Sequence, residues 1–160
     1  MFIVSAIISP ASSSFSNEMK KDASKDNKNI KIEFEYKVGE RGRGQKDIFI
    51  EADKTRIYQV LSNLLRNAIK FVKDGGTITI TADVITKKVE ADRGERGKEE
   101  QVVVIKVKDT GTGIDGVVFP RLFTKFATSS SEGIGLGLYI SKNIVEAHGG
   151  RIWADKEIEE

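Results

Sequence analysis

The stretch QVLSNLLRNAIKF at residues 59–71 decides how this chain folds. When residues 54–71 are placed at 100° each, their apolar side chains fall on one continuous face, which predicts a helix packed on a core. Asp53 is a suitable N-cap for this helix, and Asp74-Gly75-Gly76 supplies its end. The predicted core-facing side chains are Ile57, Val60, Leu61, Leu64, Leu65, Ala68 and Ile69.

The opposite face of the same helix carries a polar stripe. Asn63, Asn67 and Lys70 are spaced i, i+4 and i+7 and therefore share one side, with Gln59 and Arg66 beside them. A solvated surface is the common explanation of such a face, but asparagine is a poor helix former and a plain surface more often uses Glu, Lys or Gln. Two amide oxygens beside an ammonium could instead hold a hydrated magnesium ion and the phosphates around it.

Outside this helix, alternating apolar and polar residues predict strands. Separate helices and hairpin-joined strands favour an α+β fold, a two-layer sandwich with a mixed, mostly antiparallel sheet and helices on one face. The charged residues 86–101 are expected to form a hairpin loop. The expected strands cover residues 30–36, 48–50, 77–84, 102–108 and 151–154; residues 1–8 begin a strand or helix, and further helices are expected within 10–28 and at 138–147.

The first of two glycine clusters is DTGTGI, residues 109–114, directly after an apolar strand. Two glycines after a strand-end carboxylate let the backbone approach a flat ligand closely. The Asp109 carboxylate only accepts hydrogen bonds, so it could receive the exocyclic amine of adenine but not the keto oxygen of guanine. DTGTG is also a common loop composition, and by itself it does not decide between these interpretations.

The second glycine cluster, GIGLGL at residues 133–138, opens a helix. Free amides at a helix N-terminus bind phosphate, and glycines let the phosphate come close. The spacing is not the dinucleotide fingerprint, and the sequence contains neither a P-loop nor the HRD and DFG signatures of Ser/Thr kinases. Residues 115–132, with Phe119, Phe123 and Phe126, could form a lid over a nucleotide or a small hydrophobic cluster under a long loop.

Composition narrows the class of protein. The 160 residues fit one domain, and a net charge of +2 gives no reason to expect nucleic acid as a partner. No cysteine is present and His148 is the only histidine, which excludes disulfides and zinc sites built on thiolates or imidazoles. The apolar residues 1–8 are too few for a membrane span, and the positive charge that precedes the apolar stretch of a signal peptide is missing, so a cytoplasmic location is the default expectation.

The four motifs together, in this order, resemble the ATP-binding catalytic domain of histidine kinases. That domain is related to DNA gyrase B subunits, mismatch-repair ATPases and heat-shock chaperone ATPases. The resemblance runs from about Ile30 to Ala154, most of the chain. It is carried by QVLSNLLRNAIKF (59–71), DTGTGI (109–114), FPRLFTKF (119–126) and GIGLGLYISKNIVEAHGG (133–150).

The resemblance implies ATP and Mg²⁺ as cofactors and gives each motif a role. Asn67 would be the magnesium ligand, Asn63 and Lys70 would lie beside the phosphates, and these three would be the catalytic residues. Phe71 would lie against the nucleotide, and Asp109 would bind the adenine amine. The remaining nucleotide-binding residues would be Gly111, Gly113, Ile114, Phe126, Gly133, Gly135, Leu136, Gly137 and Leu138.

The chain also departs from the family. The helical dimerisation domain with its phosphoacceptor histidine is absent from the 160 residues, so that domain would be a separate partner, with a response regulator contacted only indirectly. Any membrane anchor would belong to the parent protein. His148, in the helix-ending AHGG, is expected to be structural. Thr112 replaces a residue that is often apolar, the 86–101 loop is long, and the chain ends at Glu160 where the family adds a strand.

Three functions fit this pattern. The first is transfer of the γ-phosphate of ATP to a histidine on a separate helical domain, as in two-component signalling. The second is an ATP-hydrolysing clamp, whose family members carry a glutamate base four residues before the magnesium asparagine. That position is Asn63 here, and an amide is a poor general base, which favours the kinase. The third is a non-catalytic module that binds ATP.

Overall fold

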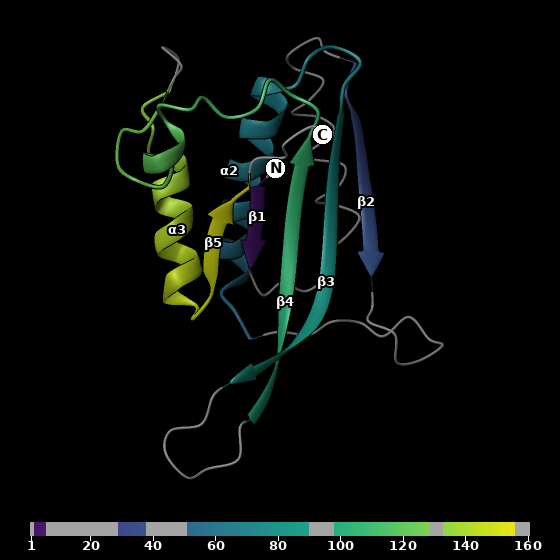
Figure 1. The fold of residues 1–160 in the computed structure, drawn as a ribbon, viewed down its shortest axis with the longest axis vertical. Helices are drawn as coiled ribbons and strands as arrows, with labels where there is room; N and C mark the ends of the chain where they lie inside the picture. Colours follow the sequence, from purple (N-terminus) through teal and green to yellow (C-terminus); the bar gives the residue numbers. More distant parts are fainter. Residues whose placement is uncertain (1, 6–28, 38–50, 90–97, 129–132, 156–160) are drawn as a thin grey trace.

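A computed structural model describes residues 2–5, 29–37, 51–89, 98–128 and 133–155. These residues form one mixed sheet, two α-helices and one turn of 3-10 helix (Figure 1). The expected helix within residues 10–28 and the expected strand at 48–50 lie outside the described residues. The elements are β1 (Phe2–Ser5), β2 (Lys31–Lys37), α2 (Lys54–Phe71), β3 (Thr77–Val89), β4 (Lys98–Asp109), η1 (Phe119–Arg121), α3 (Gly137–Ala147) and β5 (Arg151–Ala154).

The sheet has the strand order β2-β3-β4-β1-β5. β2 pairs with β3 in parallel, and every other neighbouring pair is antiparallel. The parallel pair is possible because α2 connects β2 to β3 as a crossover, which a hairpin could not do. The prediction of a mixed, mostly antiparallel sheet is therefore confirmed, with β4 in a central position.

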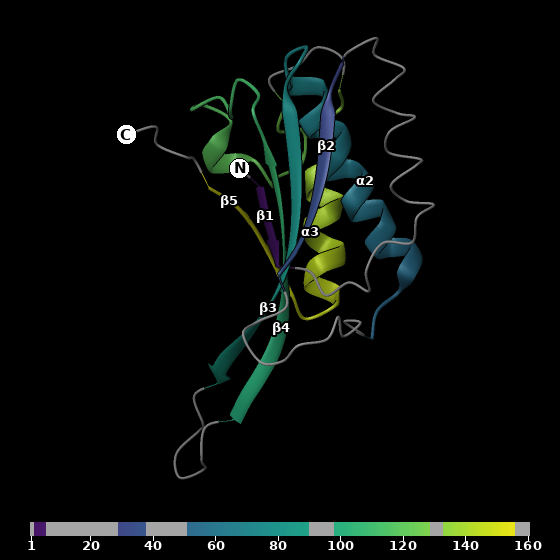
Figure 2. The same cartoon turned by 90° about the vertical axis from the view of Figure 1, so that its right-hand side faces the viewer.

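Both α-helices lie on one face of the sheet and form the second layer of the sandwich (Figure 2). The core lies between the layers, where the apolar face of α2 meets alternate side chains of β3 and β4. All seven side chains predicted for that helix face are buried. The buried core residues contributed by other elements are Val72, Ile78, Ile80, Val103, Ile105, Val107, Ile144, Val145 and Ile152.

The expectation of a loop over residues 86–101 is wrong at both ends. β3 continues to Val89 and β4 begins at Lys98, with Lys87 opposite Glu100 and Lys88 opposite Glu99 in the register. β2 pairs with β3 only as far as Asp83, so the outer parts of β3 and β4 pair only with each other and extend beyond the helices (Figures 1 and 2). Opposite charges on facing positions favour a two-stranded ribbon in a segment that is too polar to look like a strand.

Local hydrogen bonds fix both ends of α2. The Asp53 carboxylate accepts hydrogen bonds from the backbone N–H groups of Thr55 and Arg56, at 2.9 and 3.1 Å, so the predicted N-cap is confirmed. After Phe71 the chain turns through Gly75, whose φ is +74°. The helix therefore ends where the Asp-Gly-Gly sequence predicted.

The C-terminus of α3 is closed by a Schellman motif. Gly149 N–H donates to the Glu146 carbonyl at 3.0 Å, and Gly150 N–H donates to the Val145 carbonyl at 2.9 Å, with Gly149 at φ +72°. The glycines of AHGG therefore end this helix.

His148 lies at the same end of α3 and connects it to the start of α2. The Asp53 backbone N–H donates to His148 Nε2 at 3.1 Å, which leaves the ring proton on Nδ1, 2.7 Å from the Ile144 carbonyl. Both ring nitrogens are therefore engaged within the fold.

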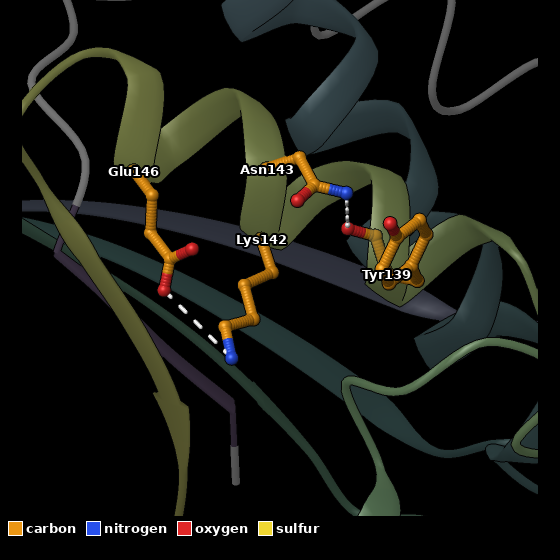
Figure 3. Close-up of polar contacts among 4 residues, drawn as sticks. All are labelled: Tyr139, Lys142, Asn143 and Glu146. Carbon is orange, nitrogen blue, oxygen red and sulfur yellow. Dashed lines mark hydrogen bonds and ion pairs between the residues drawn. The ribbon is translucent and has the colours of Figure 1, made fainter.

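The outer face of α3 is polar (Figure 3). Asn143 Nδ2 donates to the Tyr139 carbonyl one turn earlier, at 3.0 Å, and Lys142 Nζ lies 3.8 Å from a Glu146 carboxylate oxygen.

No helix in the described part of the chain is long and apolar enough to cross a bilayer.

Candidate functional site

A cavity of about 590 Å³ lies between the polar stripe of α2, the end of β4 and the start of α3. The segment around and after η1 forms a further wall. Such a volume is typical of sites for small molecules and cofactors. The lining residues are Asn63, Arg66, Asn67, Lys70, Phe71, Asp109, Gly113, Ile114, Asp115, Val118, Leu122, Ala127, Thr128, Gly133, Ile134, Gly135, Leu136, Gly137 and Leu138.

The α2 wall contains the three residues of the predicted stripe and Phe71, which the resemblance suggested. Asn63, Asn67, Lys70 and Phe71 all line the cavity, and the Phe71 side chain is 36% exposed. Asn63 Nδ2 donates to the Gly137 carbonyl at 3.2 Å and to Ser141 Oγ at 3.3 Å. Asn63 therefore joins α2 to α3, while Asn67 makes no side-chain hydrogen bond within the described ranges.

Asp109 ends β4 with a half-buried carboxylate that faces the cavity. Its Oδ1 accepts a hydrogen bond from Gly111 N–H at 2.8 Å, and no described group pairs with Oδ2. A Cβ on Gly111 would lie 2.6 Å from the Phe71 carbonyl oxygen, so this position has room only for glycine. Gly111 does not line the cavity itself and instead shapes the turn that holds Asp109.

The start of α3 presents backbone amides to the same cavity. Leu136 is the N-cap residue but makes no side-chain capping bond, and the first turn contains no acidic residue. The first intrahelical bond of this turn runs from Ile140 N–H to the Leu136 carbonyl, so the amides of Gly137 to Tyr139 have no helical acceptor. This wall is suited to an anion.

The backbones of Gly135 and Phe126 are in direct contact just before α3. Phe126 N–H donates to the Gly135 carbonyl at 3.0 Å, and a Cβ on Gly135 would lie 2.7 Å from the Phe126 carbonyl carbon. Phe126 has φ +63°, and its side chain is 67% exposed and does not line the cavity. The implied contact of Phe126 with a nucleotide is therefore not found in this structure.

An apolar cluster lies under the same segment. Val118 and Leu122 are buried against Ile114, Phe123 and Leu138, so of the three phenylalanines expected in a hydrophobic cluster only Phe123 packs here.

Several lining residues were not predicted. Arg66 lies on the same helix face as Lys70 and could have been found from that spacing. The Asp115 carboxylate caps the turn into η1, accepting from Val117 N–H at 2.7 Å, and neither its place nor that of the apolar cluster has a distinct sequence signal. The other residues missed are Val118, Leu122, Ala127, Thr128 and Ile134.

The cavity walls differ in chemistry from one side to the other. The Asp109 carboxylate and apolar side chains such as Ile114 line the cavity after β4, whereas the uncapped start of α3 lies beside Asn63 of the α2 stripe. A ligand that fits both sides carries hydrogen-bond donors on a flat apolar part and negative charge at the other end. Nucleoside phosphates have this combination.

Comparison with known proteins agrees with this chemistry. A sequence profile of the family described as histidine kinase-, DNA gyrase B-, and HSP90-like ATPase matches residues 52–160. The chain therefore belongs to this family of ATP-binding domains, and the fold is the histidine kinase ATP-binding fold.

Two curated relatives and one solved structure illustrate the similarity. The chain is 37% identical over 121 residues to sensor histidine kinase WalK of Bacillus subtilis, covering 72% of this chain and 18% of WalK. It is 42% identical over 111 residues to the adaptive-response sensory kinase SasA of Synechococcus elongatus, covering 67% of this chain and 25% of SasA. The catalytic domain of histidine kinase ThkA superposes with a TM-score of 0.65 at 28% identity, covering 98% of this chain and 89% of that domain.

The chain spans only a quarter or less of the curated relatives that it matches.

Proposed function

We propose that the cavity binds Mg-ATP, with adenine at Asp109 and the triphosphate at the start of α3. The observation that carries this proposal is the opposed chemistry of the two walls of one cavity. Asp109 Oδ2 supplies an acceptor on one side, and the amides of the first α3 turn supply donors on the other. Lys70 and Arg66 add positive charge to the α2 wall.

The α2 stripe has a donor set that suits magnesium. Asn67 and Asn63 offer amide oxygens, and Mg²⁺ usually keeps several waters while one or two protein oxygens and the substrate phosphates complete its shell. When bound, the ion would neutralise charge that develops on the phosphates during transfer. The role of the protein residues would be to hold the triphosphate and orient its terminal phosphate.

We also propose that the domain transfers the γ-phosphate to a histidine on a separate helical domain. The relatives named above are sensor kinases, which supports transfer over hydrolysis. The contacts of Asn63 support it further, because its NH₂ group is tied to Gly137 and Ser141 and an amide cannot take a proton from water. The chain would therefore position ATP, and the partner domain would supply the nucleophile.

Calorimetric titration with ATP, ADP and GTP, with and without magnesium, tests the binding step. We expect magnesium-dependent binding of the adenine nucleotides with Kd in the micromolar to millimolar range, about −4 to −8 kcal/mol. Equal affinity for GTP would show that Asp109 does not read adenine, and no affinity for Mg-ATP would remove the proposal altogether.

Phosphotransfer to a separately made helical domain with an acceptor histidine tests the second step. The expected product carries an acid-labile, alkali-stable label on the helical domain of the cognate pair. Release of inorganic phosphate at a comparable rate without the partner would instead favour the ATPase clamp.

A further inference from the structure

Ser141 lies beneath the phosphate side of the cavity but does not line it. It is 0% exposed, and its Oγ donates to the Gly137 carbonyl at 2.9 Å. The same Oγ accepts a hydrogen bond from Asn63 Nδ2 at 3.3 Å, and Nδ2 also donates to the Gly137 carbonyl at 3.2 Å. Three groups from α2 and α3 thus form a closed triangle of hydrogen bonds.

This triangle permits only one orientation of the Asn63 amide. A carbonyl oxygen such as that of Gly137 can only accept hydrogen bonds, and the Ser141 hydroxyl proton is already donated to it. If the amide were turned over, Asn63 Oδ1 would face the Gly137 carbonyl oxygen without a proton between them, and the two oxygens would compete for the single Ser141 hydroxyl proton. The NH₂ group must therefore face α3, which leaves Oδ1 without a partner among the described residues, on a side chain that lines the cavity.

Resting on the proposed function, we infer that Ser141 is a positioning residue that makes Asn63 present its amide oxygen, and not its NH₂ group, to the bound Mg-ATP. An amide oxygen is suited to a divalent cation or to its water shell, whereas an NH₂ group is suited to a phosphate oxygen. The Gly137 carbonyl selects the orientation of the amide, and Ser141 holds it by donating its proton to that carbonyl and accepting the second hydrogen bond from Asn63 Nδ2. Ser141 does so from a buried place that no ligand reaches.

The outer face of α3 offers a matched control. Asn143 Nδ2 donates to the Tyr139 carbonyl at 3.0 Å, a side-chain bond to the carbonyl one turn earlier, like that of Ser141 to Gly137 (Figure 3). Asn143 is exposed and lies about 200° around the helix from Ser141, so Asn143→Ala removes a comparable bond without touching Asn63.

The quantity to measure is the ratio of ATP affinity with magnesium to ATP affinity in EDTA. We expect Ser141→Ala to lower this ratio about three- to tenfold, the range that one hydrogen bond contributes. Asn143→Ala should leave it within about twofold of wild type, as expected for an exposed substitution away from the site. A wild-type ratio in Ser141→Ala, in a protein that binds Mg-ATP normally, would overturn the inference while leaving the proposed function intact.

A double-mutant cycle separates positioning from general stability. If Ser141 acts through Asn63, Ser141→Ala should have no further effect on the ratio in an Asn63→Ala background. An equal loss in both backgrounds would mean that Ser141 supports only the fold, and would overturn the inference.

The ligand-free protein gives an independent readout. The two Asn63 side-chain NH₂ proton resonances should shift in Ser141→Ala and stay in place in Asn143→Ala. Ser141→Cys, which keeps a group of similar size with weak hydrogen bonding, serves if the alanine variant does not fold. Unchanged Asn63 resonances would overturn the inference. If wild type binds no ATP, the proposed function fails, and these resonances still decide whether Ser141 holds the amide.

Discussion

The two glycine clusters, residues 109–113 and 133–137, both contribute to the lining of one cavity but differ in the chemistry they present to it. The first cluster begins with the Asp109 carboxylate, and its Gly111 amide donates a hydrogen bond to Asp109 Oδ1. The second leads into α3, whose first amides have no helical acceptor. One cluster therefore presents an acceptor and the other presents donors, and the element next to each cluster decides which.

Within each cluster one glycine is packed tightly against backbone atoms, and another has open space around it. A Cβ on Gly111 or Gly135 would lie under 3.0 Å from backbone atoms. A Cβ on Gly113 would meet nothing within 4 Å, and one on Gly133 only Thr128 Oγ1 at 3.9 Å. At Gly111 and Gly135, glycine is required because a side chain would clash with backbone atoms. At Gly113 it is required only for the positive φ, and at Gly133 neither reason applies.

The largest effect is expected for Gly135→Ala. Its φ of +72° costs a side chain about 1–2 kcal/mol, and overpacking against Phe126 and Ala127 adds about 1–3 kcal/mol. Urea unfolding should therefore show a loss of about 2–5 kcal/mol. A smaller loss of unfolding free energy than in Gly113→Ala would contradict the distinction between tightly packed and open glycines.

Asp109→Asn should come next and act on binding. The new amide can keep the bond from Gly111 through its oxygen, which puts NH₂ in the place of Oδ2, facing the adenine amine. We expect ATP affinity to fall by about 1–3 kcal/mol, roughly 5- to 150-fold, measured by calorimetry. Asp83→Asn is the control, because Asp83 pairs with Lys106 outside the cavity and its loss should leave affinity unchanged. Wild-type affinity in Asp109→Asn would mean that adenine is read elsewhere.

Gly113→Ala should cost about 1–2 kcal/mol of stability, because φ is +76° but the space is open. Gly133→Ala has neither problem in this structure and should change thermal stability little. Equal losses for the two variants would show that positive φ is not what separates them.

Hydrogen exchange should sharpen the comparison without any substitution. We expect the amides of 115–128, including that of Phe126, to gain protection when a non-hydrolysable ATP analogue binds, as for a lid that closes. The Gly111 amide is already bonded to Asp109 and should change less. No change across 115–128 would indicate a fixed loop.

The last prediction is the absence of a reaction, namely autophosphorylation of the isolated chain. This chain alone should bind ATP but incorporate no label from γ-labelled ATP, because both nitrogens of His148 are engaged with Asp53 and Ile144. His148 also lies at the far end of α3 from the second glycine cluster, about 15 Å at 1.5 Å per residue. An acid-labile, alkali-stable label that disappears in His148→Gln would contradict this prediction.

The sequence predicted well what short-range patterns determine. The 3.6-residue period and Asp53 located α2 with its two faces, and all of the site residues suggested by resemblance except Gly111 and Phe126 line the cavity. Phe126 has a positive φ and does not line the cavity, and no residue type predicts that backbone conformation. The outer ends of β3 and β4 were missed because residues 86–101 are strongly charged and lack the alternating apolar pattern of a strand, and their pairing becomes visible only in the register.

The position of β1 in the sheet has a consequence for the order in which the domain can assemble on a ribosome. Phe2 pairs with both Val107 and Ala154, so β1, the first of the described strands along the chain, lies between β4 and β5. At about 5–20 residues per second, β1 waits roughly 5–20 s before β4 has emerged to receive it. β5 in turn pairs only with β1 among the described strands, so β1 is the element through which β5 joins the sheet.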